Sequence, residues 1–473
     1  MSLWPSLTVV AVLACAGCDG AQPAAPDAST SDARGRDPST PDAFVVDPPP
    51  APTTIAGPLT ITTWGDRPFL SPASIDEVLD TRFSIGREFF VAAWVVAPNA
   101  TRPNIDGLGP LLHAPSCVAC HPIDRRAPSL EPDGTVGVGL LFRLATPGPA
   151  GLAPDPVLGV QLQPSGIPGV PAEAIISHTA GALPPYGGSA ASAKPVFTFA
   201  IDPAYGAMAA DTRAGARLSP QLLGMGLLEA VADDAILALE DPDDIDGDGV
   251  SGRAARLAGG AIGRFGWKAV HPALAPQTLA AFANDIGIAS ADVPDDCTPS
   301  QHACRAAAHG GDPELASADA TAVDTFMRLL GVPAARRTVG DPHVERGHEV
   351  FVTAGCASCH QPTLTTRATA RPAILASVTF YPYTDLLLHD LGPALADELG
   401  EGDASASEWR TPPLWGIGLV ESQPGGRFLH DGRAASIADA IRWHGGEAQL
   451  SAEAFAALSI ADEDALLTFL RSL

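Results

Sequence analysis

Apolar residues recur at intervals of three and four positions in several stretches of this chain, which is the spacing of a helix with one buried face. The stretch at 83–90 shows this spacing, and the stretch at 322–333 shows it and then ends in Gly-Val-Pro, a helix stop signal. Helices are therefore predicted over residues 83–90, 219–231, 277–288, 322–333, 346–355 and 454–473.

Residues 130–215 are instead rich in Gly and Pro. Short apolar runs within them, at 136–142 and 195–200, predict a few short strands among irregular connections. The whole chain holds 47 Gly and 46 Pro, which agrees with long loops between the helices. The pattern thus predicts a mainly α fold with long irregular loops and a few short strands.

The first 18 residues form a short apolar run that ends in small residues, which predicts an export signal too short to span a membrane. Ala16-Gly17-Cys18 resembles a bacterial lipoprotein processing site, with lipid attached at Cys18. No Lys or Arg precedes the run, so an ordinary cleaved signal is the alternative. We expect a periplasmic or outer-envelope protein that contacts the membrane only through this anchor.

Three further segments are expected after the signal. Residues 19–56 are rich in Asp, Ala, Pro, Ser and Thr and cannot bury enough apolar surface to fold, which predicts a disordered linker. Residues 57–338 are predicted to form an N-terminal domain with inserted loops. Residues 339–473 are predicted to form a compact C-terminal domain.

Acidic residues outnumber basic ones by 54 to 28, which gives a net charge of −26. A surface of this sign repels phosphate backbones, so nucleic acid is excluded as a partner. The same charge favours a basic or neutral redox partner.

Two units read Cys-x-x-Cys-His: Cys117, Cys120 and His121, then Cys356, Cys359 and His360. This is the attachment signature of a c-type haem, in which both thiols bond covalently to the haem and the imidazole binds the iron. The alternatives are two disulfides or one zinc site built from both units. Because each unit carries its own His in the haem position, we predict two covalently bound c-type haems in two cytochrome c-like domains.

Asp244, Asp246 and Asp248 alternate with other residues and are followed by Gly249, as in the first half of a calcium loop. Ala255 stands at the twelfth position, where an EF-hand has Glu, so the alternatives are a Ca²⁺ site completed from elsewhere and a plain acidic turn. Cys297 and Cys304 lie close together in an exported chain, which predicts a disulfide, with two free thiols as the alternative.

Several motifs together resemble the bacterial dihaem oxidoreductase family, often labelled thiol oxidoreductases. The motifs are Phe-Gly-Trp-Lys-Ala at 265–269, Asp-Ile-Asp-Gly-Asp-Gly-Val-Ser-Gly-Arg at 244–253, Thr-Pro-Pro-Leu-Trp-Gly-Ile-Gly at 411–418, Leu-His-Asp-Gly-Arg-Ala at 429–434 and Trp-His-Gly-Gly-Glu-Ala at 443–448. The resemblance covers residue 57 to the end. This family is similar, more distantly, to the dihaem cytochrome c peroxidases. The similarity implies one haem per domain, with a Trp and often Ca²⁺ between the haems.

The resemblance implies roles for individual residues. His121 and His360 resemble the proximal iron ligands, and Trp267 resembles the indole between the haems, with a core Trp as the alternative. His444 takes the place of a distal Met on the second haem. Two imidazoles there lower the reduction potential relative to His and Met. His430 is then a neighbour of the ligands and not itself a ligand.

No sixth ligand is assigned to the first haem, and Met225 is interpreted as a core residue. Gln277 and Asp285 resemble polar groups of its distal pocket, where a carboxylate can take a proton from bound peroxide and return it to the leaving oxygen. The sequence thus predicts a peroxidase-like enzyme that receives electrons from a periplasmic partner, a small cytochrome or copper protein, through the second haem and Trp267. The alternatives are a non-catalytic dihaem electron-transfer lipoprotein and the oxidation of a substrate thiol at haem.

Overall fold

The computed structural model describes residues 48–62, 71–72, 74–122, 125–148, 151–294 and 297–473. The predicted signal, the anchor at Cys18 and most of the predicted linker lie outside these residues. Ile55 and Ala56 are fully buried, so the folded body begins slightly before the expected boundary at residue 57. Within the described residues, no helix is both long and apolar enough to cross a membrane.

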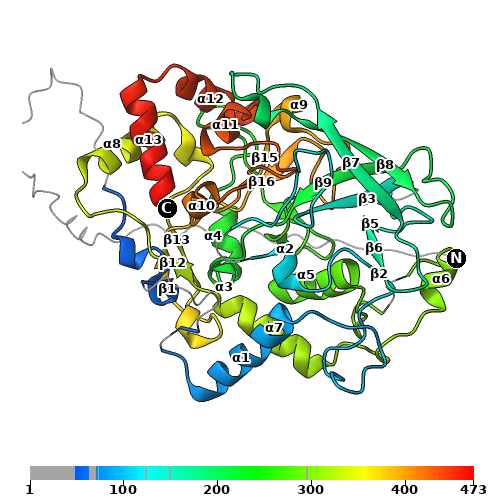
Figure 1. The fold of residues 1–473 in the computed structure, drawn as a ribbon. Helices are drawn as coiled ribbons and strands as arrows, with labels where there is room; N and C mark the ends of the chain where they lie inside the picture. The colour runs from blue at the N-terminus through cyan, green and yellow to red at the C-terminus, as the bar shows by residue number, and fades with distance from the viewer. Residues whose placement is uncertain (1–47, 63–70, 73, 123–124, 149–150, 295–296) are drawn as a thin grey trace, which may run out of the picture. The chain divides into compact units, whose positions relative to one another are not determined.

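Two helices that are far apart in the sequence cross in the first half of the fold. Helix α1 (Glu77–Val91) begins at an Asp76 cap and packs against α7 (Ser317–Leu329) (Figure 1). Gly86 lies at the crossing, where an added Cβ would fall 2.1 Å from the carbonyl oxygen of Ala322. Only a residue without a side chain permits this approach of the two backbones.

The same crossing recurs in the second half. Helix α8 (Pro342–Thr353) packs against α13 (Ile460–Ser472) (Figure 1). Gly347 lies at this crossing, and an added Cβ would fall 2.0 Å from the carbonyl oxygen of Ala465 and 2.7 Å from Phe469. We call the chain before α8 the first half and the chain from α8 onwards the second half, and each therefore has one helix pair held together at a glycine.

An antiparallel sheet lies between α1 and α7 in the sequence. Strand β3 (Leu140–Gly148) pairs with β4 (Gly151–Ala153), β5 (Gln161–Leu162) and β9 (Arg213–Leu218). A separate hairpin joins β7 (Ala174–Ala180) to β8 (Pro195–Ile201) (Figure 1). The fold is a mixture of helices and short strands, so the expectation of a mainly α protein is corrected: the Gly- and Pro-rich region forms more paired strand than its composition indicates.

The other elements are short. The remaining helices are α2 (Cys117–Cys120), α3 (Met225–Glu229), α4 (Asp233–Leu237), α5 (Leu274–Ala281), α6 (His302–Arg305), α9 (Gly392–Leu395), α10 (Ile417–Glu421), α11 (Ile437–Arg442) and α12 (Gln449–Ala456). The remaining strands form two-stranded pairs: β1 (Thr60–Ile61) with β12 (Val332–Pro333), β2 (Leu111–Leu112) with β6 (Ser165–Gly166), β10 (Ala255–Arg256) with β11 (Ile262–Gly263), β13 (Leu364–Thr365) with β14 (Thr379–Phe380), and β15 (Leu388–Asp390) with β16 (Glu408–Arg410).

The predicted helices are found, with changed boundaries. The helix expected over 219–231 shortens to α3, and the one expected over 277–288 becomes α5 followed by a π-helical turn at Phe282–Ile286. The expected C-terminal helix divides into α12 and α13. The described residues from 48 to 473 form one compact unit, and the division into two domains near residue 338 stays a prediction.

Candidate functional site

The first Cys-x-x-Cys-His unit lines a large cavity. Cys117 and Cys120 lie on α2, and His121 follows directly. The empty space, including the part open to solvent, is about 1740 Å³. His121 Nδ1 lies 2.9 Å from the carbonyl oxygen of Pro220. Because a carbonyl only accepts, Nδ1 carries the proton and Nε2 keeps its lone pair for a metal.

The second unit lines a separate cavity in the same manner, with an empty space of about 1400 Å³. His360 Nδ1 donates to the carbonyl oxygen of Tyr383 at 2.9 Å, again leaving Nε2 free. His444 lines this cavity too, and its Nδ1 donates to the carbonyl oxygen of Ala440 at 2.8 Å. Burial, with a smaller contribution from His444, lowers the pKa of His360 to about 4. Burial also lowers the pKa of His444, so both rings are neutral, as iron ligands must be.

The two alternatives to haem attachment have no support in this arrangement. Cys117, Cys120, Cys356 and Cys359 are free, whereas Cys297 and Cys304 form the predicted disulfide. The two units line different cavities, so they do not build one zinc site. Burial raises the pKa of Cys117 and of Cys356 to about 12, which keeps these thiols protonated and unlike nucleophilic cysteines. The residues present fit covalently bound haem.

Trp267 lines both cavities. Its Nε1 donates to the carbonyl oxygen of Leu218 at 2.8 Å, at the end of β9. The next two carbonyls accept from other site residues: Ser219 from Arg126 at 2.5 Å, and Pro220 from His121. Three consecutive backbone carbonyls therefore hold an indole, a guanidinium group and an imidazole.

His430 and Trp409 also line the second cavity. Their rings are stacked with centroids 3.7 Å apart, and the His430 ring meets Trp267 edge-on at 6.5 Å. The Lys268 ammonium group lies 3.5 Å from the Trp409 ring centroid, and burial lowers the pKa of Lys268 to about 7. Trp409 was not predicted, because it belongs to none of the motifs that point to this site.

Gln277 and Asp285 both line the first cavity. The side-chain oxygen of Gln277 is buried and has no hydrogen-bond partner among the described residues. Asp285 stands in the π-helical turn and accepts a 2.9 Å hydrogen bond from Gln161. Burial lowers the pKa of His121, and the nearby Asp285 carboxylate opposes this shift without outweighing it. Met225 and Met327 line the same cavity, so Met225 is at once a core residue and a cavity residue.

The acidic loop differs from the predicted arrangement. Carboxylate oxygens of Asp241, Asp244 and Asp246 lie within 4.8 Å of one another, whereas Asp248 is not part of this group. Asp248 instead accepts a 3.1 Å hydrogen bond from Ser358, the residue before Cys359. The group of neighbouring carboxylates therefore includes Asp241, which precedes the alternating pattern and so gave no signal, and the binding of Ca²⁺ stays a prediction.

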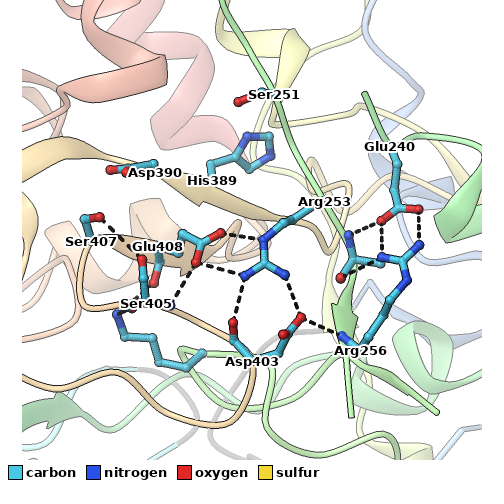
Figure 2. Close-up of polar contacts among 12 residues, drawn as sticks. Glu240, Ser251, Arg253, Arg256, His389, Asp390, Asp403, Ser405, Ser407 and Glu408 are labelled. Atoms are coloured by element: carbon cyan, nitrogen blue, oxygen red, sulfur yellow. Dashed lines mark hydrogen bonds and ion pairs between the residues drawn. The ribbon is translucent and has the colours of Figure 1, made fainter. Parts of the chain in front are cut away.

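Arg253, at the end of this loop, joins the loop to the C-terminal part of the chain. Figure 2 shows its guanidinium group between Glu408 and Asp403, with Nε 2.6 Å from Glu408 and a terminal nitrogen 2.6 Å from Asp403. Glu240 pairs with Arg256 beside it at 2.7 Å. The Asp-rich motif thus has a structural function in anchoring the loop, whether or not it binds a cation.

His389 lies behind the second attachment unit, between two carboxylates. Its Nε2 is 2.8 Å from Asp385 and its Nδ1 is 2.7 Å from Glu447, which also accepts from the Ser251 amide. Burial opposes protonation, but the hydrogen bonds to Asp385, Cys359 and Glu447 raise the pKa of His389 well above its ordinary value. A protonated, buried imidazole therefore lies beside Cys359.

The profile of a family described as "Di-haem oxidoreductase, putative peroxidase" matches residues 205–473, just over half of the chain. The first attachment unit lies outside the matched segment. A search of curated proteins finds no match.

Two solved structures resemble the chain weakly. A MauG-like protein associated with microbial copper homeostasis is 15% identical over 53% of this chain and 90% of its own, with a TM-score of 0.28. A hydrazine synthase of Kuenenia stuttgartiensis is 16% identical over 38% of this chain, with a TM-score of 0.23, and the match spans 63% of its own length.

Proposed function

This chain belongs to the di-haem oxidoreductase family, and from that premise we propose that it is an exported, peroxidase-like c-type enzyme that reduces peroxide or a related small oxidant. The observation that carries the proposal is the difference between the cavities. The second is lined by His360 and His444, whereas His121 is the one histidine among the described residues that line the first. A site with a single imidazole leaves room for a reactant.

Haem, when bound, supplies one-electron redox chemistry. The protein residues then have three tasks. His121 and His360 orient Nε2 toward the metal, because their Nδ1 protons are held by carbonyls. Trp267, which lines both cavities, places a polarisable ring between them. Gln277 offers an unpaired acceptor to an O–H group of the oxidant.

Asp285 is proposed as the group that handles protons in the first cavity. Reduction of one hydrogen peroxide to two water molecules consumes two electrons and two protons. A carboxylate in the cavity wall can accept the first proton from the oxidant and return it to the leaving oxygen. The electrons come from an external donor, proposed to be a small cytochrome or copper protein of basic or neutral charge, because this chain carries a net charge of −26.

Two further assignments belong to the same proposal. A lipid at Cys18 would hold the protein at the periplasmic or outer-envelope membrane. Ca²⁺ would bind Asp241, Asp244 and Asp246, which supply oxygen ligands of the kind that calcium prefers. The alternative function, a non-catalytic dihaem electron carrier, would need a sixth ligand in the first cavity, and Met225 and Met327 are the available thioethers there.

Low-temperature electron paramagnetic resonance of haem-loaded protein, fully oxidised and then half-reduced, tests the proposal. We expect one high-spin ferric signal that peroxide or cyanide removes, and one low-spin signal. Two low-spin signals that ignore peroxide through half-reduction would favour the electron carrier. In that case Met225→Leu and Met327→Leu, measured separately, identify the thioether ligand, because its loss converts one signal to high spin.

A further inference from the structure

Arg126 and Arg410 line both cavities, as Trp267 does. Arg410 is 8% exposed; its Nε donates to the carbonyl oxygen of Gly266 at 3.0 Å and a terminal nitrogen donates to that of Thr411 at 2.9 Å. Arg126 donates to Ser219, and its Nε is buried without a partner. Neither guanidinium group forms an ion pair with a carboxylate of the described residues.

Two other arginines of the cavity region form ion pairs with carboxylates. Arg217 pairs with Asp397 at 2.5 Å and Glu401 at 2.9 Å, and Arg433, beside the second cavity, pairs with Asp431 at 2.8 Å. Burial lowers the pKa of Arg126 and of Arg410 to about 10, so both remain charged at neutral pH. Asp385 acts on Arg410 only through a longer-range attraction that raises its pKa, so neither guanidinium group has a paired counter-ion, and an unpaired buried charge destabilises the fold. The structure therefore has a place for anions at the wall between the cavities.

We propose that Arg126 and Arg410 bind the propionate carboxylates of haem in both cavities and form one shared cationic wall. Carboxylates are the anions that haem itself carries, and guanidinium groups bind them through paired hydrogen bonds. Because each side chain lines both cavities, its positive charge acts on both irons. A nearby positive charge favours the reduced iron, which has one positive charge fewer, so the wall raises both reduction potentials together.

This inference rests on the proposed function, since it needs haem in both cavities. The experiment uses full-length, haem-loaded Arg126→Gln and Arg410→Gln, with potentiometric titration followed by absorbance and electron paramagnetic resonance to separate the two haems. We expect both midpoint potentials to fall in each variant. Arg126→Lys and Arg410→Lys, which keep the charge, should stay closer to the wild-type values.

Arg143→Gln is the matched control, because Arg143 lines only the first cavity. It should move only the midpoint of the first haem. A midpoint shift confined to one haem in both wall variants, or wild-type midpoints in either of them, would overturn the inference. Haem stoichiometry is measured in every sample: if no haem is attached, the proposed function itself fails, whereas two attached haems with unmoved midpoints refute only the cationic wall.

Discussion

Each cavity is lined by one Cys-x-x-Cys-His unit, and the two cavities differ in the other residues that line them. In both, a Cys-x-x-Cys-His turn presents a histidine whose Nδ1 proton is fixed by a backbone carbonyl. The second cavity then adds His444, whereas the first adds Gln277 and Asp285. The same attachment unit thus occurs in two cavities of different chemistry, and the difference comes from residues that lie far from the unit in the sequence.

The two helix pairs are likewise alike in their glycine contact and different in the chain that follows it. Gly86 and Gly347 occupy equivalent crossings, each against the carbonyl of an Ala on the partner helix. In the second half the glycine lies nine residues before the first cysteine, and in the first half it lies 31 residues before Cys117. The crossing is the same, but the connection in the first half is longer and leaves its cavity open to different neighbours.

Removing one attachment unit tests whether each cavity holds its own haem. Cys117→Ala with Cys120→Ala should leave one covalent haem per chain, as should Cys356→Ala with Cys359→Ala, because a thioether cannot form without the thiols. Haem staining after denaturing electrophoresis and absorbance per protein measure the ratio. Cys297→Ser with Cys304→Ser should keep both haems. Two haems in either Ala variant would contradict the assignment.

Variants of His444 test whether this imidazole is the residue that distinguishes the second cavity from the first. His444→Met should raise the midpoint potential of the second haem, because a thioether favours ferrous iron, and His444→Gly should give that haem a high-spin signal. Potentiometry and electron paramagnetic resonance measure the two effects. His178→Gln, on β7 and outside both cavity linings, is the control. Unchanged spectra in both variants would remove His444 from the ligand set.

His389 forms buried ion pairs with Asp385 and Glu447 beside the second cavity. His389→Gln should lower the free energy of unfolding by about 3–5 kcal/mol, because it leaves two buried carboxylates without their cation. Urea unfolding at several pH values measures the loss. His343→Gln is the control, since its ion pair with Asp464 is exposed and contributes little.

The pH dependence of that loss has a defined sign. The folded-state pKa of His389 is raised, so its stabilisation is complete below the unfolded-state pKa of about 6.5 and disappears as the pH rises through the raised value. Hydrogen bonds from His389 and the Asp390 amide, working against burial, lower the pKa of Glu447, whose contribution is lost as the pH falls through that lowered value. The difference between wild type and His389→Gln should therefore shrink at alkaline pH; a difference that grows there would refute the ion pair.

Trp267 is the ring between the cavities, and its replacement has the smallest expected effect of the four. Trp267→Phe should slow electron transfer between the haems about tenfold, equivalent to about 1.4 kcal/mol in the barrier, with both haems retained. Stopped-flow absorbance after half-reduction measures the rate. Trp409→Phe is the matched control, because Trp409 lines only the second cavity. Unchanged kinetics in Trp267→Phe would exclude the indole from the pathway.

The sequence alone located the parts of the site that depend on covalent spacing or on a familiar motif. The attachment cysteines and the disulfide are of this kind. Trp267, which the resemblance assigns to the space between two haems, lines both cavities, and its role stays a prediction. Three other features are set by tertiary contacts. Asp241 joins the acidic group through loop geometry, Trp409 enters through pairing of β15 with β16, and Asp285 stands in a π-helical turn that helical spacing does not signal.

The backbone carbonyls of Leu218, Ser219 and Pro220 set the relative positions of three groups of the site. Consecutive Cα atoms of trans peptides lie about 3.8 Å apart, so the separation of the three acceptors for the indole, the guanidinium group and the imidazole is limited by backbone geometry. Substitutions of these side chains leave the three backbone acceptors in the chain. The insertion of a single residue in this segment, in contrast, would displace the hydrogen-bond acceptors of these groups relative to one another.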